Sequence, residues 1–265
     1  MQTIADLVAE ARARDATLFA SVDDSADHSY EAFCTTAWKA GNLLRHYGVR
    51  PGDSVAVVVG PADPTELDEP GRLGDSPTPM LAILGGLLAG ASVTLDPVAA
   101  VEAKALVAPT AWLDDYTPGP GTKPIGYGGE VTEPTVAQFE REAWSENPVE
   151  PPVELDPTTT AIGGTEQYTH GDLLAEARRL VAETGLEAGD RVALTAPTTP
   201  GSLVAGVLAP LSVGATIVLA PAAEAAEVAI SAVDVVVTDS AGTADRLSSD
   251  AIRIDPTTVL AGRRD

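Results

Sequence analysis

Apolar and polar positions follow one another in the same order twice along the chain. In the first series, apolar residues near helical spacing predict a helix over Glu31–Tyr47. The run Ser54–Val59 shows no alternation of polar and apolar residues, which predicts a strand buried on both faces. An uncharged helix over about Pro79–Ala89 and a short strand over Ser92–Leu95 follow. The series therefore predicts a strand, a crossover helix and a parallel strand.

The second series repeats these elements further along the chain, from His170 onward. It predicts a helix over His170–Thr184, a strand over Arg191–Thr195, a helix over Ser202–Leu211 and a strand over Thr216–Leu219. Thr169 stands where the N-cap of the first of these helices is expected, with Asp172 in its first turn. Other segments also have strand or helix character: strands over Thr17–Val22, Lys104–Ala108, Lys123–Tyr127, Thr158–Ile162, Thr165–Thr169, Asp234–Thr238 and Ala251–Ile254, and a helix over Ala222–Ile230.

Strands alternating with helices indicate an α/β fold with mainly parallel sheets. Because the pattern repeats once, we expect two stacked, pseudo-symmetric α/β subdomains, with boundaries at 1–127 and 158–265. The segment 128–157 between them is rich in Pro and Glu and contains two aromatic residues, so we expect a linker that docks on the body. Asp63–Ser76 is a polar insertion without a counterpart in the second series, and we expect it to be a mobile loop.

The charge of the chain is unusually negative. The net charge is −23, and the 16 basic residues are mostly arginine. Such a surface repels phosphate backbones and anionic lipid, which argues against binding to nucleic acid or to a membrane surface. Scattered acids and few lysines are typical of a cytoplasmic protein from a salt-loving organism, although a generic acidic protein is the alternative.

Cysteine and histidine point to no further chemistry. The single cysteine, Cys34, excludes an internal disulfide, and its apolar neighbours favour a buried thiol over a nucleophile. The three histidines show no metal-ligand spacing. Residues 1–9 contain an acid and no basic stretch, so we expect no signal peptide and a cytoplasmic location.

Six segments carry recognisable motifs in a fixed order: Ser29–Phe33, Gly48–Ala56, Met80–Pro97, Tyr168–Leu174, Gly189–Val192 and Gly214–Leu219. In this order they resemble acyl-CoA synthetases and other adenylate-forming (AMP-forming) enzymes. That family has T-Y-x-E-L followed by G-V-x-x-G-D-x-V, and later L-T-H-x-N-L-L. The resemblance covers most of the chain and implies the fold of the N-terminal part of these enzymes.

The resemblance breaks at the loop with which the family binds ATP. There, a Ser/Thr/Gly-rich loop ending in lysine stands directly before the L-T-H segment and offers N–H groups and a cation to the phosphates. Here only Gly163 and Gly164 separate two β-prone runs, which favours a two-residue hairpin turn. The alternative is a vestigial phosphate loop formed by Gly163, Gly164 and Thr165, next to which Glu166 would repel phosphate.

The resemblance also places later catalytic parts of the family beyond Asp265. We therefore expect a non-catalytic binding or regulatory module that needs no cofactor. Its partner would be a second copy or a full-length synthetase, and its ligand a small acyl or nucleotide compound between the subdomains. The alternative is a minimal AMP-forming acid–CoA ligase that is active only with a complementing chain, and only then would ATP, AMP or CoA bind. A functionless remnant is the third possibility.

Overall fold

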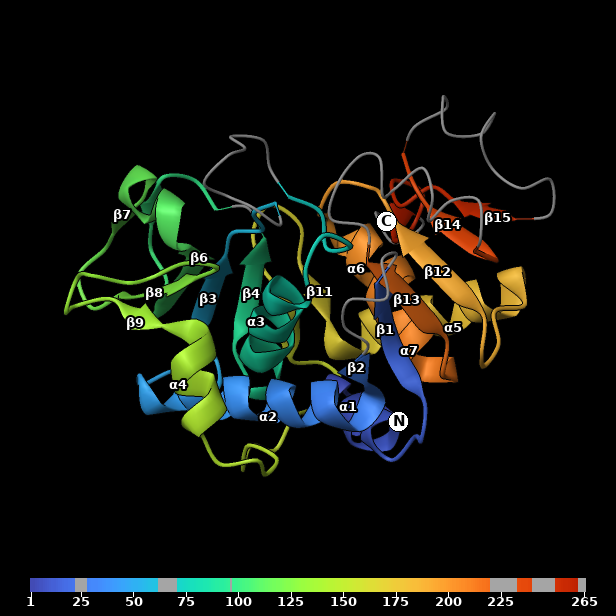
Figure 1. Ribbon diagram of the computed structural model, residues 1–265, viewed down its shortest axis with the longest axis horizontal. Coiled ribbons are helices and arrows are strands. Elements are labelled where there is room, and N and C mark those ends of the chain that lie inside the picture. Colours follow the sequence, from blue (N-terminus) through green and yellow to red (C-terminus); the bar gives the residue numbers. More distant parts are fainter. Residues whose placement is uncertain (22–27, 62–70, 96, 220–232, 240–250, 262–265) are drawn as a thin grey trace.

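The computed structural model describes residues 1–21, 28–61, 71–95, 97–219, 233–239 and 251–261. Two sheets lie side by side, the seven-stranded one on the left of Figure 1 and the six-stranded one on the right. Among the described strands, the antiparallel pairs are β1–β2 and β10–β11, and all other pairs are parallel. The predicted α/β class with mainly parallel sheets is confirmed.

The strand order shows which segments meet. The seven-stranded sheet runs β11 (Tyr168–Thr169), β10 (Thr160–Ile162), β4 (Ser92–Leu95), β3 (Ser54–Val57), β6 (Ala105–Pro109), β8 (Lys123–Tyr127), β9 (Ala137–Gln138). The six-stranded sheet runs β15 (Ile252–Ile254), β14 (Val235–Val237), β12 (Arg191–Leu194), β13 (Thr216–Leu219), β1 (Thr17–Ser21), β2 (His28–Ser29). A separate pair consists of β5 (Ala100–Val101) and β7 (Thr117–Pro118).

The helices mostly follow the predicted pattern. They are α1 (Ile4–Arg12), α2 (Tyr30–His46), α3 (Pro77–Leu88), η1 (Thr110–Asp115), α4 (Phe139–Ser145), α5 (His170–Thr184), α6 (Pro200–Leu203), η2 (Val204–Leu208) and α7 (Ala209–Val213). Thr169 and Asp172 form the expected cap of α5 as a reciprocal capping box, each side chain accepting from the other's N–H. The helix predicted over Ala222–Ile230 lies outside the described residues.

The sequence duplication is also a duplication of hydrogen bonds. In the first repeat the Gly52 N–H donates to the Gly90 carbonyl over 3.0 Å, and in the second the Gly189 N–H donates to the Gly214 carbonyl over 3.2 Å. All four residues have φ between +80° and +93°, the left-handed region that glycine enters without strain. Both repeats therefore hold the turn before the strand against the end of the crossover helix in the same way.

The hairpin at the start of each repeat pairs with the sheet that contains the other repeat's strands. Strand β1 pairs in parallel with β13, with Phe19 opposite Ile217, and β10 pairs in parallel with β4, with Ile162 opposite Val93. In both cases the second strand of the hairpin, β2 or β11, is short and leads directly into a long helix, α2 or α5. The two halves are thus joined by reciprocal strand pairing, and the boundaries at 127 and 158 stay a prediction.

The segment 128–157 lies along the edge of the seven-stranded sheet. Its strand β9 pairs in parallel with β8, with Ala137 opposite Ile125. Phe139, the first residue of α4, is buried, whereas Trp144 near the end of that helix is 79% exposed. The Phe139 ring therefore anchors α4 to the body.

The end of the polar insertion is packed between the two sheets. Most of Asp63–Ser76 lies outside the described residues, and the described part differs from the mobile loop that was expected. The Gly71 N–H donates to the Val59 carbonyl over 2.9 Å, beyond the end of β3. Leu73 is fully buried, and an alanine Cβ at Gly74 would lie 2.1 Å from the Leu194 carbonyl oxygen of β12. This segment therefore bridges the ends of strands from both sheets.

His170 ties the N-terminal helix to the second repeat. Its ring is fully buried, and Nδ1 accepts the Ile4 N–H over 3.3 Å. Because Nδ1 accepts, the neutral ring carries its proton on Nε2, and no hydrogen-bond partner for Nε2 occurs among the described residues. Burial disfavours the charged form and lowers the pKa of His170 to about 4.

This burial predicts a pH-dependent loss of stability. The folded-state pKa lies below the unfolded value near 6.5, so His170 stabilises the fold fully above about pH 6.5 and less as the pH falls toward 4. The loss by about pH 4 should be on the order of 3 kcal/mol. Urea unfolding in molar KCl should show that His170→Asn does not lose this part of the unfolding free energy as the pH falls. The exposed His46→Asn should keep it, and equal pH profiles for both variants would contradict the prediction.

Candidate functional site

The loop between β10 and β11 is longer than the sequence predicted. The two strands do form an antiparallel hairpin, but Ile162 pairs with Tyr168, so residues 163–167 connect them. The prediction of a two-residue Gly163–Gly164 turn is wrong. The Gly163 N–H donates to the Val93 carbonyl over 2.9 Å and so continues the pairing of β10 with β4. The reversal itself starts at Gly164, whose φ is +121°.

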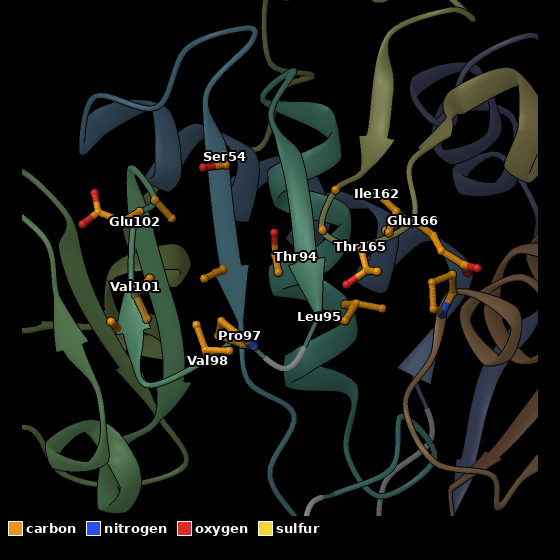
Figure 2. A pocket seen from close by; sticks show the side chains of 16 residues that line it. Ser54, Thr94, Leu95, Pro97, Val98, Val101, Glu102, Ile162, Thr165 and Glu166 are labelled. Atoms are coloured by element: carbon orange, nitrogen blue, oxygen red, sulfur yellow. The ribbon is translucent and has the colours of Figure 1, made fainter.

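This loop forms one wall of a trough on the seven-stranded sheet. The trough has a volume of about 740 Å³. Figure 2 shows Thr165 and Glu166 on one side and Val101 and Glu102 on the other. The complete lining is Ser54, Ala56, Thr94, Leu95, Pro97, Val98, Ala100, Val101, Glu102, Ala103, Ile162, Gly163, Gly164, Thr165, Glu166 and Pro200. The three residues predicted as a vestigial phosphate loop, Gly163, Gly164 and Thr165, therefore meet in one wall.

The floor of the trough is the outer face of β3 and β4. Side chains alternate along β3: Val55 and Val57 enter the main core, whereas Ser54 and Ala56 face the trough. Thr94 lies beside them on β4 (Figure 2). All three floor side chains are small, and this leaves room above the sheet.

The charged side chains of the trough are both acidic. Glu102 stands on the wall formed by residues 97–103, and Glu166 stands on the loop, where it accepts a hydrogen bond from the Tyr168 hydroxyl over 2.8 Å. The sixteen lining residues contain neither lysine nor arginine. Proteins bind a triphosphate with cationic groups and N–H donors, and the lining of the trough contains no cationic side chain.

Two smaller hollows continue the trough along the same face. One, of about 370 Å³, adds Gly52, Asp53, Gly90 and Ser92, which belong to the duplicated turn. The other, of about 410 Å³, adds Lys104, Pro120, Gly121 and Thr122. Ser54 lines all three. Lys104 thus brings a cation to the neighbouring hollow, on the side away from the glycine loop.

The sequence did not identify the floor and the opposite wall as a site. In the sequence, Ser54 and Thr94 have only the character of strand residues, and Glu102 is one of 39 acidic residues. A usable signal was present: the nine residues 96–104 between β4 and β6 are too few for the helix that usually connects parallel strands.

The remaining candidates carry no site in the described part of the chain. Cys34 is buried, as predicted, and burial raises the pKa of its thiol to about 12, which makes it a poor nucleophile. No group of three or more His, Cys, Asp or Glu residues suited to a metal ion occurs among the described residues. None of the described helices combines the length and apolarity needed to cross a membrane.

Comparison with solved structures identifies the fold. The N-terminal domain of FACL13 from Mycobacterium tuberculosis superposes with a TM-score of 0.70 and 14% identity over 89% of this chain. A benzoate CoA ligase from Burkholderia xenovorans LB400 superposes with a TM-score of 0.67 and 20% identity over 89% of this chain. The long-chain-fatty-acid-CoA ligase FadD1 from Archaeoglobus fulgidus superposes with a TM-score of 0.69 and 18% identity, also over 89% of this chain. The resemblance to adenylate-forming ligases is therefore confirmed as a shared fold.

The chain corresponds to only part of these proteins. It covers 62% of the FACL13 domain, 50% of the benzoate ligase and 51% of FadD1. No protein-family profile matches the sequence, and no curated protein sequence matches it.

Proposed function

We propose that this chain is a non-catalytic binding or regulatory module built on the N-terminal fold of acyl-CoA ligases. The observation that carries the proposal is the composition of the trough beside the Gly163–Gln167 loop. Two glutamates and no lysine or arginine line the position at which the family resemblance expects a phosphate loop. Adenylation requires the phosphates to be clamped by cations while the carboxylate attacks in line, and this lining repels phosphate instead.

The test is ATP–pyrophosphate exchange by the purified protein in molar KCl. We expect no incorporation of labelled pyrophosphate into ATP with acyl substrates such as benzoate or octanoate. Calorimetric titration with Mg-ATP should likewise detect no binding at millimolar concentration. Magnesium-dependent binding of ATP, or exchange by the protein alone, would overturn the proposal.

A second function is favoured by the partial coverage of the similar structures. The chain corresponds to about half of the benzoate CoA ligase and of FadD1, and we propose as the second function a minimal AMP-forming acid–CoA ligase that is active only with a complementing chain. Exchange activity that is absent from the lone protein and appears after addition of a full-length synthetase from the same cell would support this function. ATP, AMP or CoA would then bind at the assembled site.

Few large apolar side chains are exposed on the described surface. Among the described residues, the exposed large apolar side chains are Met1, Val98, Trp144, Val149 and Ile252. They come from several separate segments, so no broad apolar face supports a particular partner. We propose a second copy or a full-length synthetase as partner, in the cytoplasm. Light scattering in molar KCl tests self-association, and a strictly monomeric mass would exclude the second copy.

A further inference from the structure

The outer face of the seven-stranded sheet is covered unevenly. Near η1, side chains of this face are buried by Trp112, Leu113 and Tyr116, which pack against a small cluster: Ala56, Val58, Val101, Leu106 and Ala108. Parallel sheets in α/β proteins normally carry helices on both faces, and α3 supplies that cover on the inner face of β3 and β4. On the outer face, the described residues 97–104 of the connection from β4 to β6 form a strap that contains β5 and no helix. The sheet beside the strap therefore stays open as the trough.

The shape of the trough suits a small organic molecule. Its volume of about 740 Å³ lies within the range of about 300–1,000 Å³ that is usual for ligand sites. Val98 and Val101 on the strap face Leu95 and Ile162 across the small floor residues (Figure 2). Val98 is 77% exposed and Leu95 is half-buried, whereas Val101 and Ile162 are already buried. An apolar ligand would therefore remove Val98 and Leu95 from water.

The charges at the two walls decide which apolar ligand fits. Glu102 and Glu166 line the trough on opposite walls, and none of its sixteen lining residues is basic. Figure 2 shows their side chains directed outward, so the two carboxyl groups stand at the rims of the trough. An acyl carboxylate, a phosphate or the phosphates of CoA would be repelled from both walls. A cationic amine would be attracted by both, and ammonium groups pair well with carboxylates at partly desolvated sites.

We propose that the trough binds a small apolar amine, with its hydrocarbon part against Leu95, Val98 and Val101 and its ammonium group toward Glu102 or Glu166. The inference rests on the proposed binding function and names the ligand class of that function. It replaces the acyl or nucleotide ligand that the family resemblance suggested, because those ligands are anionic.

Three probes with the same chain length separate the effects of charge and apolar surface. Calorimetric titrations would use octylammonium, octanamide and octanoate at the lowest KCl concentration at which circular dichroism shows the protein folded, because higher salt screens the charges that the probes test. We expect octylammonium to bind at least fivefold more tightly than octanamide, and octanoate to show no binding. Octanoate binding as tight as that of octylammonium, or no binding of any probe, would overturn the proposal.

Variants then locate the binding site. Glu102→Gln with Glu166→Gln should weaken octylammonium binding about fivefold and leave octanamide unchanged, since glutamine keeps an acceptor for the Tyr168 hydroxyl. The control pair Glu130→Gln with Glu133→Gln removes the same charge at two exposed positions elsewhere. It should leave the affinities for octylammonium and octanamide unchanged. An equal loss of octylammonium binding in this control pair would mean attachment to the acidic surface in general, and the trough would be excluded.

A third variant tests the floor. Thr94→Phe fills the trough with a side chain that suits a strand and should weaken octylammonium and octanamide at least tenfold. Thr94→Val, which keeps the shape, should bind as the wild type does, and circular dichroism checks that both variants fold. Unchanged binding by folded Thr94→Phe would overturn the proposal. ATP exchange by the lone protein would overturn the non-catalytic function but not the amine preference, so the two failures are distinguishable.

Discussion

Dialysis from molar KCl into dilute buffer should unfold this protein, with loss of its helical circular dichroism. The chain has 39 acidic and 16 basic residues, so at least 23 acids cannot form a one-to-one ion pair with a lysine or arginine. The folded state holds these charges close together, and their repulsion favours the expanded chain. At about 1 M salt the Debye length is roughly 3 Å, so the repulsion between exposed acids is almost fully screened. In dilute buffer it acts over tens of ångströms.

Two controls separate screening from general salt effects. Replacing KCl with sucrose, which favours compact states without screening charge, should not restore the fold in dilute buffer. Removing three exposed charges with Glu130→Gln, Glu133→Gln and Glu150→Gln should shift the folding midpoint to lower KCl. Circular dichroism that stays unchanged in dilute buffer would contradict the interpretation of the acidic surface as an adaptation to salt.

Much of the fold could be predicted because the repeats are local patterns. The turn at Gly52 and its copy at Gly189 use the same glycine conformation and the same hydrogen bond, so one motif marks the same structure twice. The N-terminal helix α1 was missed, although its signals were present. Thr3 and Asp6 form a capping box, and the buried residues Ile4, Leu7, Val8 and Ala11 have helical spacing.

The reciprocal exchange of hairpins could not be predicted in the same way. Local sequence gives the strand character of residues 17–21 and 160–162, but their partners β13 and β4 lie far away along the chain. Any buried strand of similar length offers the same ladder of N–H and C=O groups. Partner choice depends on how the whole core closes, and that information is not local.

Prediction of the site failed in one respect for a related reason. Gly163 and Gly164 have the composition of a tight turn, yet Gly163 extends the pairing with β4 and moves the reversal further along the chain. The length of the loop was therefore set by a neighbouring strand. The prediction that Glu166 opposes phosphate depended only on charge, and the structure places this residue in the trough wall.

The junction between the two sheets offers the sharpest test of the packing. Gly74→Ala should lower the free energy of unfolding by about 4 kcal/mol or more. The added Cβ would lie 2.1 Å from the Leu194 carbonyl oxygen, which is strand backbone and cannot rotate away as a side chain could. Overpacking of this kind forces the backbone to move. Gly71→Ala should have a similar effect, because its Cβ would lie 1.9 Å from the Gly60 carbonyl oxygen.

Urea unfolding in molar KCl measures both variants against a matched control. Gly129→Ala is exposed, and its Cβ would lie 3.4 Å from the Thr110 side chain, an ordinary contact. We expect it to stay within about 0.5 kcal/mol of the wild type, as surface substitutions usually do. A Gly74→Ala protein as stable as Gly129→Ala would show that the 71–76 segment does not pack against β12 in solution. The strand ends of the two halves would then be joined without this bridge, and their contact would depend on the exchanged hairpins.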